Sequence, residues 1–86
     1  MDLPKKTKEM AWSKLGETYI LVDPATNKTF NIDTTSFLIW VQCDGKTSVE
    51  DMTDIFSVNG NRDIVKAAIV GIIDKLKDYG LVSLSS

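Results

Sequence analysis

Apolar and polar residues alternate in the first half of the chain, whereas apolar residues recur every three or four positions in the second half. A period of about two is typical of strands and a period of about 3.6 is typical of helices. The change falls within residues 28–45 (KTFNIDTTSFLIWVQCDG), where a short alternating strand passes through two capping residues into an apolar helix that stops at a glycine. The pattern predicts β structure before this stretch and α structure after it, which is an α+β fold class.

Three antiparallel strands are expected in the first half. Residues 10–15 alternate weakly and suit an edge strand, and residues 18–23 (TYILVD) are apolar on both faces, as a central strand would be. Residues 23–27 form a turn cluster in which Asn27 can adopt a left-handed conformation. Residues 28–32 (KTFNI) complete the meander.

The third strand is expected to have one free edge. Phe30 and Ile32 point inward and Thr29 and Asn31 outward, because successive side chains of a strand lie on opposite faces. An unpaired edge offers N–H and C=O groups to any extended chain, which is an aggregation hazard unless the edge is covered or used. A use for this edge is the economical interpretation.

A first helix is expected to follow the third strand directly. Asp33 or Thr34 can cap it, since either side chain can accept hydrogen bonds from the free N–H groups of the next turn. Gly45 is expected to end it as a left-handed residue. Its buried face is expected to hold Phe37, Leu38 and Val41, widened by Trp40.

A second helix is predicted near residues 47–57. Thr47 and Glu50 match a capping box, in which the hydroxyl and the carboxylate each accept from the other residue's backbone N–H. A turn at residues 58–60 would then lead to the third helix. The buried stripe of the second helix is expected to hold Val49, Met52, Ile55 and Phe56.

The third helix carries more apolar residues than a one-sided stripe requires. Asn61 can cap it, it runs to Tyr79, Gly80 stops it, and residues 81–84 form a final short strand. Either the whole apolar arc is buried against the other helices and the sheet, or its first half also lines a groove. The arc holds Val65, Ala68, Ile69, Ile72, Ile73 and Leu76, and Ile64, Ala67 and Val70 extend it.

Length and composition indicate one ordinary globular domain over residues 1–86. A chain of 86 residues with 43% apolar and 26% charged residues has room for a single modest core. Pro4 and the lysines around it predict a loose tail over residues 1–9. No segment approaches the roughly 18 apolar residues of a membrane span, and no apolar region follows the basic start. We therefore expect a cytoplasmic chain without a membrane partner.

The side-chain chemistry argues against an enzyme. The chain has no histidine, the commonest general base and metal ligand. Cys43 stands alone beside Asp44 near the end of the first helix, where an inert thiol is expected. The acidic side chains of residues 50–54 are interpreted as a solvated face, and a net charge of −2 does not suit nucleic-acid binding. We expect no cofactor and no metal, and a peptide or protein as the partner.

Four stretches together resemble one known family. They are residues 29–32 (TFNI), 35–40 (TSFLIW), 44–51 (DGKTSVED) and 76–82 (LKDYGLV). In this constellation the chain resembles the PqqD family of peptide chaperones, also called RiPP precursor peptide recognition elements, over nearly its whole length from Trp12 to Leu84. The chain departs from PqqD itself in many details, so pyrroloquinoline quinone biosynthesis as such is not implied.

The resemblance implies a winged helix-turn-helix-like domain that binds the leader segment of a ribosomally made precursor peptide. The leader would add a strand to the third strand of the sheet, in a cleft walled by the third helix, and be presented to a modifying enzyme, often a radical-SAM protein. The implied docking edge is Lys28, Thr29, Phe30, Asn31 and Ile32. The implied opposite wall is Val65, Lys66, Ala68, Ile69 and Ile72, where Lys66 could meet an acidic leader residue or remain solvated.

Two other functions stay open at this point. A winged-helix DNA-binding regulator would place a basic helix on DNA, yet residues 61–80 hold four cations and three aspartates, a net of +1. A general protein-interaction subunit could use the same strand edge, and that edge also leaves a homodimer open. Neighbouring reading frames that encode a short peptide and a maturase would favour the chaperone.

Overall fold

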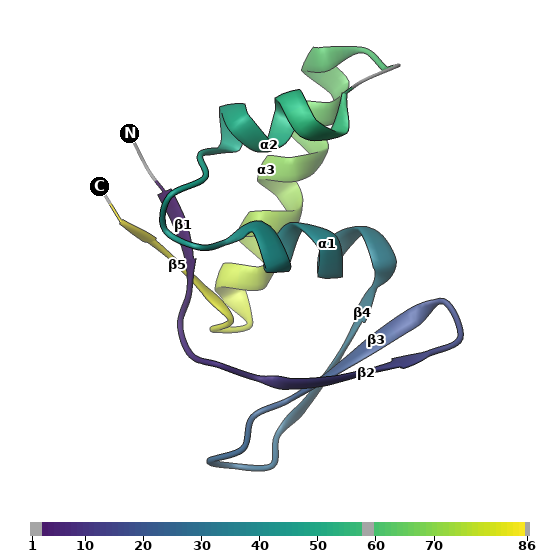
Figure 1. Cartoon of the computed structure of the whole chain (residues 1–86), viewed down its shortest axis with the longest axis vertical. Coiled ribbons are helices and arrows are strands. Elements are labelled where there is room, and N and C mark those ends of the chain that lie inside the picture. The colour runs from purple at the N-terminus through teal and green to yellow at the C-terminus, as the bar shows by residue number, and fades with distance from the viewer. Residues whose placement is uncertain (1–2, 58–59, 86) are drawn as a thin grey trace.

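The structure, a computed structural model, describes residues 3–57 and 60–85. Three helices lie above a three-stranded sheet, and a two-stranded ribbon formed by the two ends of the chain lies beside them (Figure 1). This arrangement confirms the α+β class and the order of strands before helices. The elements are β1 (Leu3–Lys6), β2 (Ala11–Leu15), β3 (Thr18–Val22), β4 (Thr29–Asp33), α1 (Thr34–Gln42), α2 (Val49–Phe56), α3 (Arg62–Asp78) and β5 (Val82–Ser85).

The antiparallel meander has the predicted strand order, β2-β3-β4. Gly16 and Asn27 hold the two turns with φ angles of 65° and 58°, in the left-handed region where glycine and asparagine are the residues best tolerated. Asn27 donates its backbone N–H to the Asp23 carbonyl oxygen at 2.7 Å, and this hydrogen bond closes the second turn. The local turn chemistry thus sets the register of all three strands.

One face of the sheet packs against α1. Alternation puts Leu21 of β3 and Ile32 of β4 on that face, and both side chains are buried. Phe37 of α1 stacks on Tyr19 with ring centroids 3.8 Å apart and an interplanar angle of 2°. The ring of Trp12 lies 4.9 Å from that of Phe37 and covers the outer side of the stack. This contact fixes the helical half onto the sheet.

The prediction of a loose tail over residues 1–9 is wrong for the described part of that segment. Leu3–Lys6 forms β1, which pairs antiparallel with β5. Pro4 is buried opposite Leu84, and its carbonyl oxygen accepts from the Gly45 N–H at 2.9 Å. Proline is compatible with an edge strand because only one side of such a strand needs its N–H groups. The prediction failed because the pairing partner lies about eighty residues away in the sequence.

The expected buried face of α1 is wrong in part. Leu38 and Val41 are 44% and 43% exposed, whereas Ile39 and Trp40 are buried together with Phe37. The helix is covered from two sides, by the sheet and by α3, so its buried arc is rotated from the stripe that its apolar residues suggest. The helix is capped by Asp33, one of the two residues expected.

Two capping details also differ from the predictions. The helix α1 ends at Gln42, and Gly45 lies in the loop beyond it with a φ angle of 77°. The capping box of α2 uses Ser48 and Asp51, one residue later than expected, because TSVED offers two pairs with the same spacing. Ile55, expected in the buried stripe of α2, is 50% exposed, and Thr53 is buried instead.

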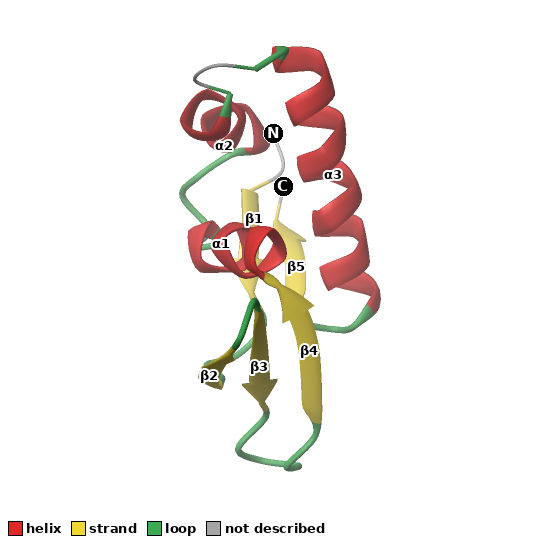
Figure 2. Cartoon of the chain, turned by 90° about the vertical axis from the view of Figure 1, so that its right-hand side faces the viewer, coloured by secondary structure: helices red, strands yellow, loops and turns green. Residues whose placement is uncertain are grey.

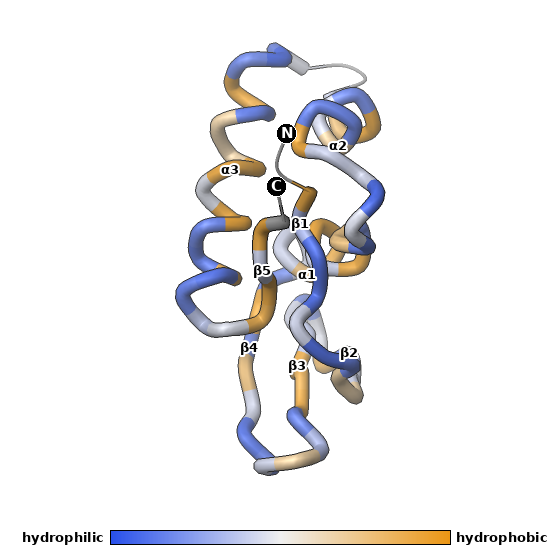
Figure 3. The backbone as a smooth tube through the Cα atoms, turned by 90° about the vertical axis from the view of Figure 1, so that its left-hand side faces the viewer, coloured by the Kyte–Doolittle hydropathy of each residue, from blue (hydrophilic) through white to orange (hydrophobic). Residues whose placement is uncertain are grey.

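The third helix begins and ends as predicted. Asn61 caps it by accepting from two backbone N–H groups, and Gly80 follows its end with a φ angle of 78°. The N–H of Leu81 donates to the Leu76 carbonyl oxygen at 2.9 Å, as in a Schellman motif. Hydrophobic and hydrophilic positions alternate along this helix in Figure 3. Part of the turn expected before it, residues 58–59, lies outside the described residues.

Candidate functional site

Within the described residues, β4 pairs with β3 alone, so its other edge is open. The N–H of Asp23, which follows β3, donates to the Lys28 carbonyl oxygen at 2.9 Å, so the backbone of Lys28 bonds toward the β3 side. Inward and outward hydrogen-bonding residues alternate along an antiparallel strand. Phe30 and Ile32 therefore bond toward β3, and Thr29 and Asn31 present their N–H and C=O groups to the open edge.

The C-terminal end of α3 lies near β4, and the rest of the helix extends away from the sheet (Figure 2). The rings of Phe30 on β4 and Tyr79 at the end of α3 have centroids 5.9 Å apart. The pKa of Asp33, the last residue of β4, is lowered by hydrogen bonds from Ser36 and, to a smaller extent, by the positive charge of Lys75. Two positions near the end of α3 thus lie along β4.

An apolar cavity of about 300 Å³ lies just beyond the carboxyl end of β4. Its single polar lining residue is Thr35, two positions after the last residue of the strand. All three helices contribute to it, and the largest share comes from the first half of α3. The lining residues are Thr35, Ile39, Phe56, Ile64, Val65, Ala68, Ile69 and Ile72.

The structure brings most of the predicted wall together. Val65, Ala68 and Ile72 line the cavity with at least part of their surface exposed. Ile69 lines it as well, but it is only 2% exposed and belongs to the hydrophobic core. Both interpretations of the α3 arc therefore hold for different positions: Ile69, Ile73 and Leu76 are core, and the first half also faces the cavity.

Lys66 does not line the cavity. It forms an ion pair with Glu50 of α2, and Arg62 bonds the same carboxylate at 2.8 Å and also pairs with Asp54. The pKa of Glu50 is lowered by Lys66 first and by Arg62 second. These contacts tie α2 to α3 and engage two of the four cations that a DNA-binding helix would need free.

Several lining residues were missed in the sequence. Phe56 belongs to α2, and Thr35 and Ile39 belong to α1. They meet α3 through packing between helices, which local sequence patterns do not reveal. Lys75 and Tyr79 continue the spacing of Ala68 and Ile72 along the helix by three and four positions. That spacing places all four residues on one face of the helix, which a search for apolar residues alone does not show.

Cys43 lies away from the open edge and is 1% exposed. Its thiol donates to the Ile39 carbonyl oxygen at 3.2 Å, and burial raises the pKa of Cys43 to about 11. A thiol with such a pKa is protonated at neutral pH and is a poor nucleophile. The buried position of this thiol agrees with the prediction from the sequence, and its inertness stays a prediction.

Comparisons with known proteins identify the family and the fold of the chain. No helix in the described ranges is long and apolar enough to cross a membrane. No curated protein matches the chain. A solved structure described as TbiB1 in complex with the TbiA(beta) leader peptide shares the fold, with a TM-score of 0.71 and 16% sequence identity over 92% of this chain and 94% of that chain. The model of the family described as coenzyme PQQ synthesis protein D (PqqD) matches residues 18–82, well over half of the sequence, and the chain therefore belongs to the PqqD family.

Proposed function

We propose that this domain binds the leader segment of a ribosomally synthesised precursor peptide by strand addition to β4. The observation that carries the proposal is the open edge at Thr29 and Asn31, which continues at its carboxyl end into an apolar cavity. Strand addition needs both elements, because backbone hydrogen bonds hold any extended chain and side-chain pockets select among chains. The leader peptide bound to TbiB1, which shares the fold, supports the same class of ligand.

The expected affinity is moderate. Two or three apolar leader side chains buried against α3 would each contribute about 1.5 to 3 kcal/mol. The cost of ordering a disordered peptide and of losing its translational freedom offsets much of this gain. We expect dissociation constants of roughly micromolar to tens of nanomolar order.

The proposed role is recruitment without catalysis. The sequence has no histidine, and the single thiol is buried and protonated. We propose that the domain works in the cytoplasm and delivers the leader to a modifying enzyme, for which a radical-SAM maturase is the favoured candidate. Peptide binding at β4 would also compete with any homodimer formed through the same edge.

Amide chemical-shift mapping tests the proposal. The isotope-labelled domain is titrated with synthetic leader segments of any short precursor peptide that is found encoded next to its gene. Shifts are expected at residues 29–32 and along residues 64–73 of α3, where the strand and the cavity lie. Saturable binding that leaves both stretches unperturbed would place the site elsewhere.

A pair of proline variants provides the matched control. Asn31→Pro removes an N–H from the open edge of β4 and leaves the bonds to β3 intact. Lys14→Pro removes an outward N–H in the same way from β2, at the other edge of the sheet. Asn31→Pro is expected to weaken binding by about tenfold or more, and Lys14→Pro to leave it unchanged. Equal losses in the two variants would contradict strand addition at β4.

A further inference from the structure

The two ends of the β4 edge differ in chemistry. The cavity at the carboxyl end is apolar, whereas aromatic rings and lysines surround the amino end. A second cavity, of about 280 Å³, lies at this amino end between the turn before β4 and the end of α3. Its lining residues are Lys8, Met10, Asp23, Thr26, Lys28, Phe30, Tyr79, Gly80 and Leu81.

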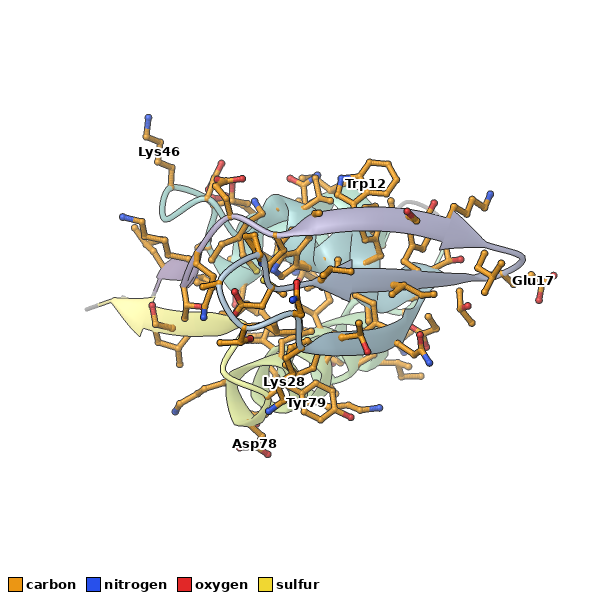
Figure 4. The ribbon with its side chains drawn as sticks, turned by 90° about the horizontal axis from the view of Figure 1, so that it is seen from below. Trp12, Glu17, Lys28, Lys46, Asp78 and Tyr79 are labelled. Atoms are coloured by element: carbon orange, nitrogen blue, oxygen red, sulfur yellow. The ribbon has the colours of Figure 1, made fainter. Side chains whose placement is uncertain are left out.

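Two lysines lie beside the Phe30–Tyr79 pair, one just before β4 and one in the last turn of α3. The Nζ atom of Lys28 lies 5.3 Å from the centroid of the Phe30 ring, and that of Lys75 lies 5.9 Å from the centroid of the Tyr79 ring. The centroids of the two rings are 5.9 Å apart, so each lysine lies beside one ring of the same aromatic pair. Lys28 and Tyr79 lie together beside the β4 edge in Figure 4.

Lys28 and Lys75 are the cations beside these two rings, and the charge of Lys75 also acts on Asp33 at the end of β4. Neither Lys28 nor Lys75 takes part in an ion pair among residues 3–57 and 60–85, although Lys8, which lines the same cavity, is neutralised by Asp23 at 2.6 Å. Lys75 in the last turn of α3 also complements the helix dipole. That explanation does not apply to Lys28, which lies on the strand side.

We infer that the segment bound along β4 carries an acidic side chain beside the Phe30–Tyr79 pair, between Lys28 and Lys75, spaced along the strand from an apolar side chain in the α3 cavity. This inference rests on the proposed strand addition and specifies its ligand. A carboxylate over the Phe30–Tyr79 pair would lie near the charges of Lys28 and Lys75, each of which is placed beside one of the two rings. The same two lysines would disfavour basic segments, so charge selects among extended chains that β4 alone would accept equally.

A display selection of random twelve-residue peptides provides the test. Wild-type protein is expected to enrich peptides that contain both a bulky apolar residue and an Asp or Glu a few positions away. One enriched peptide is then synthesised with its acidic residue and with the corresponding amide. The wild type is expected to prefer the acidic form by about three- to tenfold at low salt, with a smaller preference at high salt.

Two double variants separate the contributions. Lys28→Gln/Lys75→Gln is expected to abolish the preference for the acidic form, whereas Lys14→Gln/Lys46→Gln, with the same change in net charge, is expected to keep it. If the peptides lose affinity for Asn31→Pro but the wild type shows no preference for the acidic form, this inference alone is overturned. Peptides that bind Asn31→Pro normally, or a selection that yields no binder, overturn the proposed strand addition and this inference with it.

Discussion

In the part of the chain that the structure describes, the sheet has two open edges, and they differ in what lies beside them. Both β2 and β4 are five residues long, pair with β3 on one side, and present outward N–H and C=O groups at alternate positions. Seen from below in Figure 4, Trp12 lies on the β2 side of the sheet and Tyr79 on the β4 side. The strand β2 is exposed along its whole length, whereas Phe30 of β4 contacts Tyr79 at the C-terminal end of α3.

This difference shows why an open edge alone does not make a binding site. Backbone groups at the two edges can form the same hydrogen bonds, each with a small net gain over water. At β4, the proposed added strand would also bury side chains in the cavity that α3 lines. At β2 the outward position Lys14 places a charge at the edge, a common protection against unwanted pairing.

The largest effect is expected from Ile69→Asp, which tests whether the wall beside β4 is also core. Ile69 is 2% exposed, and an unpaired carboxylate there should cost about 4 kcal/mol or more of unfolding free energy. Ala68→Asp, on the exposed neighbouring position, should leave stability within about 0.5 kcal/mol and weaken peptide binding. Chemical denaturation and peptide titration of both variants provide the measurement. A stable Ile69→Asp variant would contradict the assignment of Ile69 to the core.

Phe37→Ala is expected to loosen α1 from the whole sheet and so affect both edges. The ring is buried, stacks on Tyr19 and contacts Trp12, and its loss should cost about 3 to 5 kcal/mol. Denaturant unfolding measures the change. A cost below about 1 kcal/mol would show that the stack does not hold the two halves together.

Trp12→Ala separates the edges, because it removes the largest side chain on the β2 side. Trp12 is 54% exposed, so the expected cost is about 1 to 2 kcal/mol, less than for Phe37. Peptide affinity, measured at a temperature where the variant remains folded, is expected to stay within about twofold of the wild type. A large loss of affinity would indicate that the peptide reaches the β2 side as well.

Lys8→Gln is expected to have the smallest effect and to depend on pH. The pKa of Asp23 is lowered by its bond to Lys8 first and by the Ala25 N–H second, so ionised Asp23 stabilises the fold above its ordinary pKa. The wild type should be more stable than Lys8→Gln near neutral pH, and the difference should vanish as the pH falls through the lowered pKa of Asp23. Thermal unfolding from pH 7 to pH 2 measures this, with Lys46→Gln as the control. A difference that is independent of pH would show that Lys8 acts through packing alone.

The parts of the fold that follow from local chemistry were predictable. The meander, its turn at Asn27 and both ends of α3 depend on neighbours in the sequence, and the structure confirms them. The pairing of β1 with β5 and the burial of Ile39 in place of Leu38 depend on contacts between distant segments. Local periodicity carries no information about which distant surface covers a helix.

The candidate site was predictable to a similar extent. The open edge was expected from the order of the strands. The family resemblance implied Val65, Ala68 and Ile72 as the wall, and the surplus of apolar positions on α3 left core and groove both open. Lys75 and Tyr79 were not predicted because neither belongs to the apolar arc, although both share a helix face with Ile72. Lys66 was assigned to the wall although its ion pair with Glu50 turns it toward α2.

The β1–β5 ribbon has a consequence for how this domain can be joined to other polypeptides. Leu3 and Ser85 are opposite each other in the ribbon, about one strand spacing apart. The two ends leave the domain side by side, away from the β2-β3-β4 sheet (Figure 1). A host protein could therefore carry the domain as an insert within one of its surface loops, with little strain on either chain and with the β4 edge still accessible.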